Sequence, residues 1–456
     1  MFIYKKRNDE IIITGLRKDA TNFSIVIPET INGMPVTGIS EYAFRGSLVT
    51  DVKIGQNIKE VGKEAFSGCK RLKSVTWNCI CAKIPALCFS DCLSLTHFDF
   101  SKIKEIGHSA FLKSGLLEVY LPTNIEEVSN RAFFNCTQLK KAVWACKCKK
   151  IPDCCFYGCS ELTQFDFSNI EIISKGSFEK SGLQEIQLSQ NIKYVFGEAF
   201  EECKKLQKVV WNCDCDEIPE SCFYECSNLK QFDFSEIKSI DNSAFSRSGL
   251  QEAYLPENIG AISNSAFSNC MQLKKVIWKC KCDSIPYHCF DTCSSLNQFD
   301  FSNIKKIGYG GFWASGLQKI HLPFNIKEIE AQAFSDCENL SQVIWNCEYK
   351  EVPELCFFGC SSLKQFSFSN IKKLKARAFA GSGLTSITLN KGTEVGKSCF
   401  AGCNDLEKVE WLSARSIKGD IFENCKNIKE VFISDKVKTI EKTAFRSSPG
   451  TEFTFV

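Results

Sequence analysis

Tryptophan recurs along this chain at a fixed interval, and that period constrains the fold more than any other feature. Trp77, Trp144, Trp211, Trp278 and Trp345 each follow the previous one by 67 residues, and a sixth comes 66 residues later, at Trp411. A constant period of this kind indicates a repeat architecture in which each unit packs only on its neighbours. The 456 residues are therefore expected to form one solenoid instead of several globular domains.

Each 67-residue block contains three smaller units, and each unit is marked by a phenylalanine that usually follows Ala or Cys. Nineteen of these marker phenylalanines occur at steps of 21 to 23 residues, from Phe44 to Phe445. After each marker, a Leu opens a short alternation of apolar residues, such as Val119 and Leu121 in the third unit of a block. Period-two alternation over so few residues predicts a short strand with one buried face.

The resulting prediction is an α/β-type solenoid, a leucine-rich-repeat arc of about nineteen parallel rungs. Each rung is expected to carry one short strand, including the Phe-Asp-Phe segments such as 98–100, and long crossovers force the strands to pair in parallel. The segment around each marker is too short for a full helix, so a short α or 3-10 turn is expected on the other side.

The 38 phenylalanines agree with this packing. Nineteen are the markers, and ten more lie in five Phe-Asp-Phe or Phe-Ser-Phe segments, from Phe98 and Phe100 to Phe366 and Phe368. Rings at such regular positions are predicted to form the core and not a platform on which bases or sugars stack.

The segment IPETINGMPVTGISEYAF, from Ile27 to Phe44, resembles the opening of BspA-type leucine-rich-repeat proteins. Downstream units such as LPTNIEEVSNRAFFNCTQL resemble the 22–23-residue repeat of that family, and the resemblance covers about residues 27 to 446. It implies a curved right-handed solenoid that binds proteins, in the manner of surface antigens and adhesins that bind host or matrix proteins. The family pattern supplies no catalytic residue.

Three segments are expected along the chain. Residues 1–38, with two strand-like runs around a polar turn, are predicted to form an N-terminal β cap. Residues 39–389 hold the regular repeats in 67-residue triplets, and residues 390–456 hold irregular terminal repeats and a final strand, TEFTFV. Because an unpaired terminal edge invites pairing with another chain, this strand predicts a homodimer.

Composition and charge exclude several classes of protein. Apolar residues make up 44% of the chain and charged residues 24%, which provides ample material for a core. The net charge of +3 makes nucleic acid an unsuitable partner. No run of 18 apolar residues occurs, so no transmembrane segment is expected, and the charged start MFIYKKRNDE does not fit a signal peptide.

The cysteines also follow the repeat. Of 28 cysteines, 27 lie in three columns: three residues after a marker, directly before a marker, or in a Trp-x-Cys-x-Cys motif. Free cysteine packs as a small apolar residue, which is the favoured interpretation. Disulfides are the alternative, because six pairs such as Cys69 and Cys92 occupy one column on adjacent rungs, ~4.8 Å apart.

Neither a metal site nor an enzyme is expected. The Cys-x-Cys pairs lack a second pair at finger-like spacing, and the four histidines are scattered, whereas a closed zinc site needs four convergent ligands. Only His288 adjoins a cysteine, Cys289, and that cysteine belongs to a buried column. No catalytic residue and no cofactor is therefore predicted.

The outward face of the strands is the candidate protein-binding site. In the Trp rungs it presents apolar residues, in the Phe-Asp-Phe rungs acidic ones, and in the third rungs mixed ones. Acidic groups three rungs apart, roughly 14 Å, cannot share a calcium ion. The candidate residues are Val143, Val210, Ile277, Ile344, Asp99, Asp166, Asp233, Asp300, Tyr120 and Tyr254.

These observations favour a non-enzymatic protein-binding solenoid. One hypothesis is a surface antigen or adhesin-like protein whose partner is a host matrix protein, and it places the chain at the cell surface. The alternative is an intracellular interaction scaffold with reduced thiols and a cellular partner; the missing signal peptide and the cysteine usage favour the cytoplasm. A thiol-rich metal-binding protein is the remote alternative.

Overall fold

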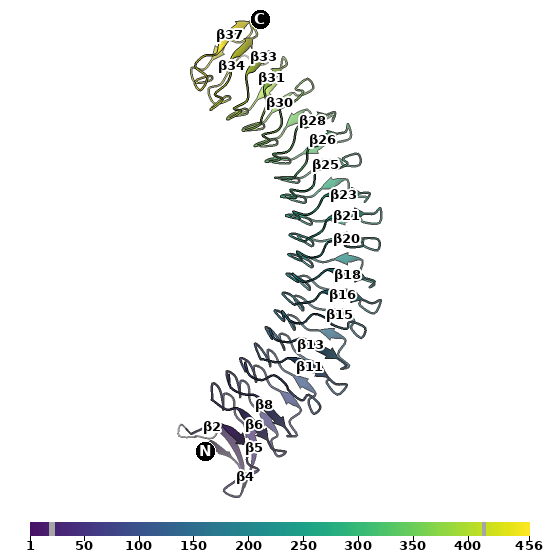
Figure 1. Cartoon of the computed structure of the whole chain (residues 1–456), viewed down its shortest axis with the longest axis vertical. Coiled ribbons are helices and arrows are strands. Elements are labelled where there is room, and N and C mark those ends of the chain that lie inside the picture. Colours follow the sequence, from purple (N-terminus) through teal and green to yellow (C-terminus); the bar gives the residue numbers. More distant parts are fainter. Residues whose placement is uncertain (18–22, 413–415) are drawn as a thin grey trace. The chain divides into compact units, whose positions relative to one another are not determined.

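The computed structural model describes residues 1–17, 23–412 and 416–456, which form two compact units, Met1–Leu229 and Lys230–Val456. In each unit the chain winds as a parallel β-solenoid, with about twenty turns in the two units together (Figure 1). The predicted solenoid is thus confirmed. The division into a cap, a regular segment and an irregular segment stays a prediction.

The first unit begins with an antiparallel hairpin, followed by short strands. Its strands are β1 Phe2–Arg7, β2 Glu10–Leu16, β3 Ser24–Val26, β4 Thr30–Ile31, β5 Met34–Ile39, β6 Asp51–Ile54, β7 Glu60–Val61, β8 Ser74–Trp77, β9 Lys83–Ile84, β10 Glu105–Ile106, β11 Glu118–Leu121, β12 Glu127–Val128, β13 Lys141–Trp144, β14 Lys150–Ile151, β15 Ile172–Ile173, β16 Glu185–Leu188, β17 Tyr194–Val195, β18 Lys208–Trp211 and β19 Glu217–Ile218.

The second unit repeats the pattern of short strands and ends in one of four residues. Its strands are β20 Ser239–Ile240, β21 Glu252–Leu255, β22 Ala261–Ile262, β23 Lys275–Trp278, β24 Ser284–Ile285, β25 Lys306–Ile307, β26 Lys319–Leu322, β27 Glu328–Ile329, β28 Gln342–Trp345, β29 Glu351–Val352, β30 Lys373–Leu374, β31 Ser386–Leu389, β32 Glu394–Val395, β33 Lys408–Trp411, β34 Ser416–Ile417, β35 Glu430–Ile433, β36 Thr439–Ile440 and β37 Glu452–Phe455.

Most turns differ from the expected single strand. In the regular blocks the four-residue strand of a third turn pairs with that of the next Trp turn, as β11 does with β13. The two-residue strands form separate three-stranded sheets, such as β12-β10-β9. Each Trp turn and each third turn therefore carries two strand segments.

The Phe-Asp-Phe segments are not strands, and the prediction of a strand at residues 98–100 is wrong. The feature shared by all five segments is a pair of rings whose centroids lie 4.9 Å apart, as in Phe98 and Phe100. In the last block β-branched Val431 and Ile433 occupy this place, and β35 forms there and pairs with β33. Intrinsic strand preference does not explain this difference, because aromatic and β-branched side chains are both favoured in strands.

The expected short helical turns are also wrong, since no helix occurs in residues 1–17, 23–412 or 416–456. At the second marker turn, Glu64 and Gly68 have φ of 56° and 70°, outside the right-handed helical region. Backbone N–H groups alternate there: Ser67 donates to Glu64 at 3.1 Å, whereas Phe66 donates to Cys88 of the next turn at 3.0 Å. Half of the donors thus bond between turns, which excludes a helix.

The marker phenylalanines form a buried ladder, which confirms their prediction as core. The rings of Phe133 and Phe156 are stacked at 5.5 Å with an interplanar angle of 9°, and both side chains are fully buried. The indole of Trp144 meets Phe156 edge-on at 6.0 Å. The ring stack and the tryptophans beside it are therefore part of the core of each unit.

A Ser-Gly-Leu sequence that follows five of the marker phenylalanines, at intervals of 67 residues, brings two turns into close contact. Gly182 N donates to Cys159 O at 3.1 Å, and a Cβ atom on Gly182 would lie 2.2 Å from Ser160 O. A Cβ atom on the equivalent glycines Gly115, Gly316 and Gly383 would lie 2.1, 2.1 and 1.9 Å from a carbonyl oxygen of the preceding turn. Glycine is required at this position because a side chain would force the turns apart.

Candidate protein-binding face

The strand face is formed by residues that stand opposite each other in paired strands. In the first unit Tyr120 lies opposite Val143, and Gln187 lies opposite Val210. In the second unit Tyr254 lies opposite Ile277, and His321 lies opposite Ile344. Side chains before and after these positions are mostly buried, so the alternation directs these residues outward, as predicted.

Exposure along this face is uneven. Tyr120 is 59% exposed and Tyr254 is 57% exposed, although both are large aromatic side chains. Ile344 is 40% exposed, whereas Val143, Val210 and Ile277 are half-buried. Each tyrosine therefore projects beyond the aliphatic residue beside it, and the two together form an apolar patch with a hydroxyl at its outer end.

The four predicted aspartates are exposed, and the residues on either side of each, such as Phe98 and Phe100, are half-buried or buried. Each carboxylate accepts a hydrogen bond from the backbone N–H of the serine two residues later: Asp99 from Ser101, Asp166 from Ser168, Asp233 from Ser235 and Asp300 from Ser302, at 2.9 to 3.0 Å. In the last pair this bond lowers the pKa of Asp300 below its ordinary value. The aspartates thus shape the turn after each Phe-Asp-Phe segment. The Asp-x-Ser spacing is the signal that could have revealed this role.

The cysteines three residues after a marker are buried hydrogen-bond donors. All 28 cysteines lie in the described part of the chain and are free thiols. Cys136 Sγ donates to Phe111 O at 3.1 Å, and Cys159 Sγ donates to Phe133 O at 3.3 Å. Burial raises the pKa of Cys136 to about 11. These thiols therefore link successive turns, a function that small size alone did not predict.

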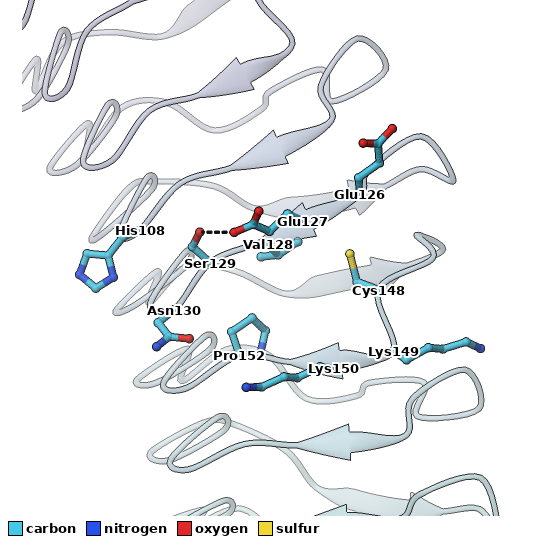
Figure 2. Close-up of a pocket in the computed structure, with 10 residues that line it drawn as sticks. All are labelled: His108, Glu126, Glu127, Val128, Ser129, Asn130, Cys148, Lys149, Lys150 and Pro152. Carbon is cyan, nitrogen blue, oxygen red and sulfur yellow. Dashed lines mark hydrogen bonds between the residues drawn. The ribbon is translucent and has the colours of Figure 1, made fainter.

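A shallow hollow of about 500 Å³ lies beside Cys148, on the side of the two-residue strands β12 and β14 (Figure 2). Glu127, Lys149 and Lys150 line it, and Ser129 Oγ donates to Glu127 at 3.4 Å. Similar hollows lie beside Cys215 and Cys282. The thiol of Cys148 contacts the backbone carbonyl oxygen of Ile125 at 3.9 Å.

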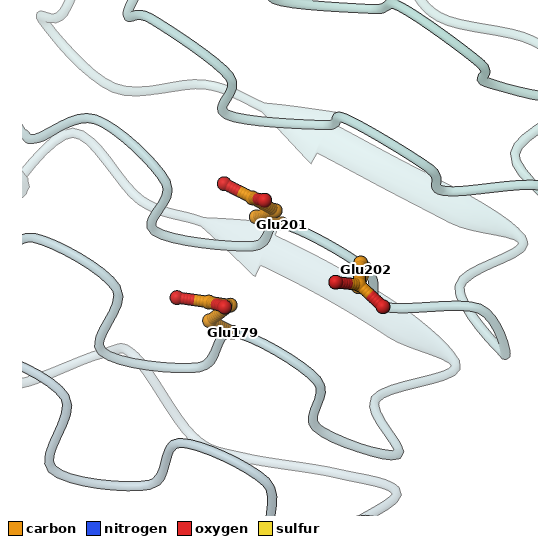
Figure 3. A group of neighbouring side chains, drawn as sticks. All are labelled: Glu179, Glu201 and Glu202. Atoms are coloured by element: carbon orange, nitrogen blue, oxygen red, sulfur yellow. The ribbon is translucent and has the colours of Figure 1, made fainter.

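Three glutamates meet at the marker turns of the first unit, with carboxylate oxygens within 4.8 Å of one another (Figure 3). Lys180 Nζ contacts both Glu179 and Glu202 at 3.1 Å. Burial, together with the neighbouring carboxylates, raises the pKa of Glu201 to about 7. A lysine ammonium therefore already supplies the positive charge, and the cluster is an ion-paired contact between turns.

The fold and the repeated motifs define a leucine-rich-repeat solenoid. The profile of the BspA-type leucine-rich repeat region (6 copies) matches residues 37–163, 149–274, 216–341 and 327–452. The chain belongs to this family. Proteins of the family are generally non-enzymatic repeat scaffolds that bind other proteins. No curated protein matches the chain.

Several solved structures are similar to the chain. A leucine-rich repeat protein from Bacteroides ovatus is 20% identical over 100% of this chain and 98% of its own, with a TM-score of 0.39. A leucine rich cell surface protein from Faecalibacterium prausnitzii is 18% identical over 98% and 96%, with a TM-score of 0.31. The pneumococcal vaccine antigen PcpA is 14% identical over 100% and 96%, with a TM-score of 0.33.

Among the residues that the structure describes, none belongs to a helix long and apolar enough to cross a membrane.

Proposed function

We propose that this chain is a non-enzymatic protein-binding solenoid that contacts its partner through the strand face, as an adhesin-like surface antigen contacts host or matrix proteins. The observation that carries the proposal is the register of exposed tyrosines with aliphatic residues, Tyr120 with Val143 and Tyr254 with Ile277. Tyrosine is enriched at interfaces because it provides a large apolar surface and a polar end.

The exposed aspartates give the proposed contact patch a polar border. A specific interface combines a desolvated apolar centre with a solvated rim. In the first unit Asp99 and Asp166 belong to the turns on either side of the Tyr120–Val143 pair. The backbone N–H groups that bond them hold their carboxylates in place, so little conformational freedom is lost when a partner approaches.

Charging the patch is expected to weaken binding. Tyr120→Asp combined with Val143→Asp should lower affinity for a partner by tenfold or more, ~1.4 kcal/mol, because two charges would be desolvated at the centre of the contact. The measurement is retention of proteins from a host-cell surface extract on the immobilised chain, followed by affinity measurements with each retained protein.

The matched control is Tyr194→Asp combined with Phe196→Asp, which changes two exposed aromatic residues on β17 and just after it, away from the strand face. Tyr194 is 59% exposed, the same as Tyr120, and Phe196 is 50% exposed. Both double variants should melt as the unchanged chain does. If the control loses the partner and the strand-face variant retains it, the contact surface lies elsewhere.

An intracellular scaffold is the second candidate function, and the 28 free thiols favour it because reducing compartments keep cysteines in this state. Labelling intact cells with an impermeant biotin reagent separates the two candidates. Recovery of the labelled chain supports the adhesin-like protein, whereas labelling only after lysis supports the scaffold.

We also propose self-association through β37, which pairs with β35 along one edge. Phe453 and Phe455 on this strand are 45% and 68% exposed. An open edge with exposed apolar side chains is a template for pairing with a second copy. Light scattering on the unchanged chain and on Phe455→Lys measures whether a dimer forms and whether it depends on this edge.

A further inference from the structure

Four blocks of the repeat carry a pair of cysteines that the strand face does not use. These pairs are Cys79 and Cys81, Cys146 and Cys148, Cys213 and Cys215, and Cys280 and Cys282. In every case the tryptophan at the start of the motif fixes the backbone of the second cysteine. The indole Nε1 donates to the carbonyl oxygen of that cysteine at 2.8 Å in all four blocks.

The two thiols of each pair interact directly with each other. The second cysteine is half-buried in all four pairs, whereas Cys79, Cys146 and Cys280 are 5%, 5% and 4% exposed. At least one cysteine of each pair is therefore within reach of a small solute, and in the third pair both Cys213 and Cys215 are half-buried. This arrangement differs from the marker columns, whose thiols are fully enclosed and bonded to carbonyls.

Three of the second cysteines line an open hollow, and the surroundings of the sulfur vary between the hollows. All three hollows contain both lysine and carboxylate side chains, but their formal charges sum to 0, −2 and +1. The charged residues are Glu126, Glu127, Lys149 and Lys150 at Cys148, Lys193, Asp214, Asp216 and Glu217 at Cys215, and Lys281, Asp283 and Lys306 at Cys282. The net charge therefore changes from one hollow to the next, whereas the sulfur is present in each. A ligand common to these sites must therefore be recognised by sulfur itself and not by the charge around it.

We propose that each Cys-x-Cys pair is a two-sulfur binding site for a soft thiophilic cation, Cu(I). Soft thiolate ligands select Cu(I), whereas a structural zinc ion needs four ligands that these pairs do not offer. Binding replaces the two thiol protons by one Cu(I) ion, releases both protons to solvent and leaves the site with one net negative charge. The expected absence of a metal site applies to closed four-ligand sites, which a two-coordinate ion does not need.

The fifth block provides an internal control, because Tyr349 stands where the other four blocks have the second cysteine. The backbone there is the same: Trp345 Nε1 donates to Tyr349 O at 2.8 Å, as Trp77 Nε1 does to Cys81 O. Cys347 Sγ lies 3.6 Å from Tyr349 O, and Cys79 Sγ lies 3.7 Å from Cys81 O. Tyr349→Cys should therefore create a fifth pair on an unchanged turn.

The test is an anaerobic Cu(I) titration of the full reduced chain against a chromogenic Cu(I) chelator. We expect four ions per chain, three for Cys148→Ser, five for Tyr349→Cys and four for Cys154→Ser, which removes a half-buried thiol outside the pairs. X-ray absorption should find two sulfur neighbours per copper ion. Circular dichroism confirms that each variant is folded.

Two results would overturn the proposal. One is failure of the chain to hold Cu(I) against the chelator. The second is a number of copper ions per chain that is the same in Cys148→Ser, in Tyr349→Cys and in the unchanged chain, because the copper would then be bound by other thiols. This measurement does not depend on protein binding. A negative result for one proposal therefore does not affect the other.

Discussion

Trp144→Ala is expected to lower the free energy of unfolding by about 3–5 kcal/mol, the range for truncating a large buried aromatic side chain. Trp144 is 5% exposed, packs edge-on against Phe156 at 6.0 Å and lies 6.3 Å from Phe165. Its indole also donates to Cys148 O at 2.8 Å. The substitution removes the ring contacts and leaves an unsatisfied carbonyl in the turn that follows.

Chemical denaturation of the variant measures the loss, and hydrogen exchange shows where it occurs. Because each turn contacts only its neighbours, exchange should speed up around β11, β13 and β14 and stay unchanged at β1 and β2. Trp144→Phe is the matched control, since it keeps a ring but loses the N–H donor, and it should cost about 1–2 kcal/mol. Uniform loosening along the first unit would contradict the nearest-neighbour account.

Gly182→Ala is expected to destabilise the chain by about 3 kcal/mol, although it adds only one methyl group. That methyl would lie 2.2 Å from Ser160 O and 3.3 Å from Leu162 O. Backbone atoms cannot move aside as the end of a flexible side chain can, so the two turns must separate and strain the bond from Gly182 N to Cys159 O.

Gly55→Ala is the control in the same unit, because its nearest neighbour outside the adjacent residues, Ile27 O, would lie 3.6 Å from the new methyl group. This variant should be neutral or gain about 0.4–1 kcal/mol from the lower entropy of the unfolded chain. Thermal melts of the two variants give the comparison. Equal melting temperatures would show that the turns at Gly182 can separate without cost.

The sequence predicted the repeat and its core because both depend on spacing alone. A fully buried ring such as Phe133 is identified by its regular spacing from the other marker phenylalanines, and this spacing does not depend on the local backbone conformation. The backbone of the marker turns was harder to predict, since Glu64 adopts a positive φ that glutamate rarely shows in isolation. Hydrogen bonds to the next turn hold it there, and no local sequence rule contains them.

The candidate site was predictable in its orientation and not in its detail. Alternation around Tyr120 and Val143 predicts which side chains face outward, because the period of a strand is two. The degree of exposure could not be predicted in this way. Tyr120 is far more exposed than Val143, because exposure depends on the size of the side chain and on the neighbouring strand. The hydrogen bond from Trp144 Nε1 to Cys148 O could not be predicted either, because it depends on the path of the backbone after the strand.

The pairing of each third turn with the following Trp turn has a consequence for how such a chain changes in length. Gain or loss of one whole 67-residue block in the coding sequence leaves every strand of the regular blocks beside its proper neighbour. Loss of a third turn alone would instead place a Phe-Asp-Phe segment beside the Trp turn, where a matching strand is required. Gain or loss of a whole block therefore preserves the strand pairing, whereas loss of a third turn does not.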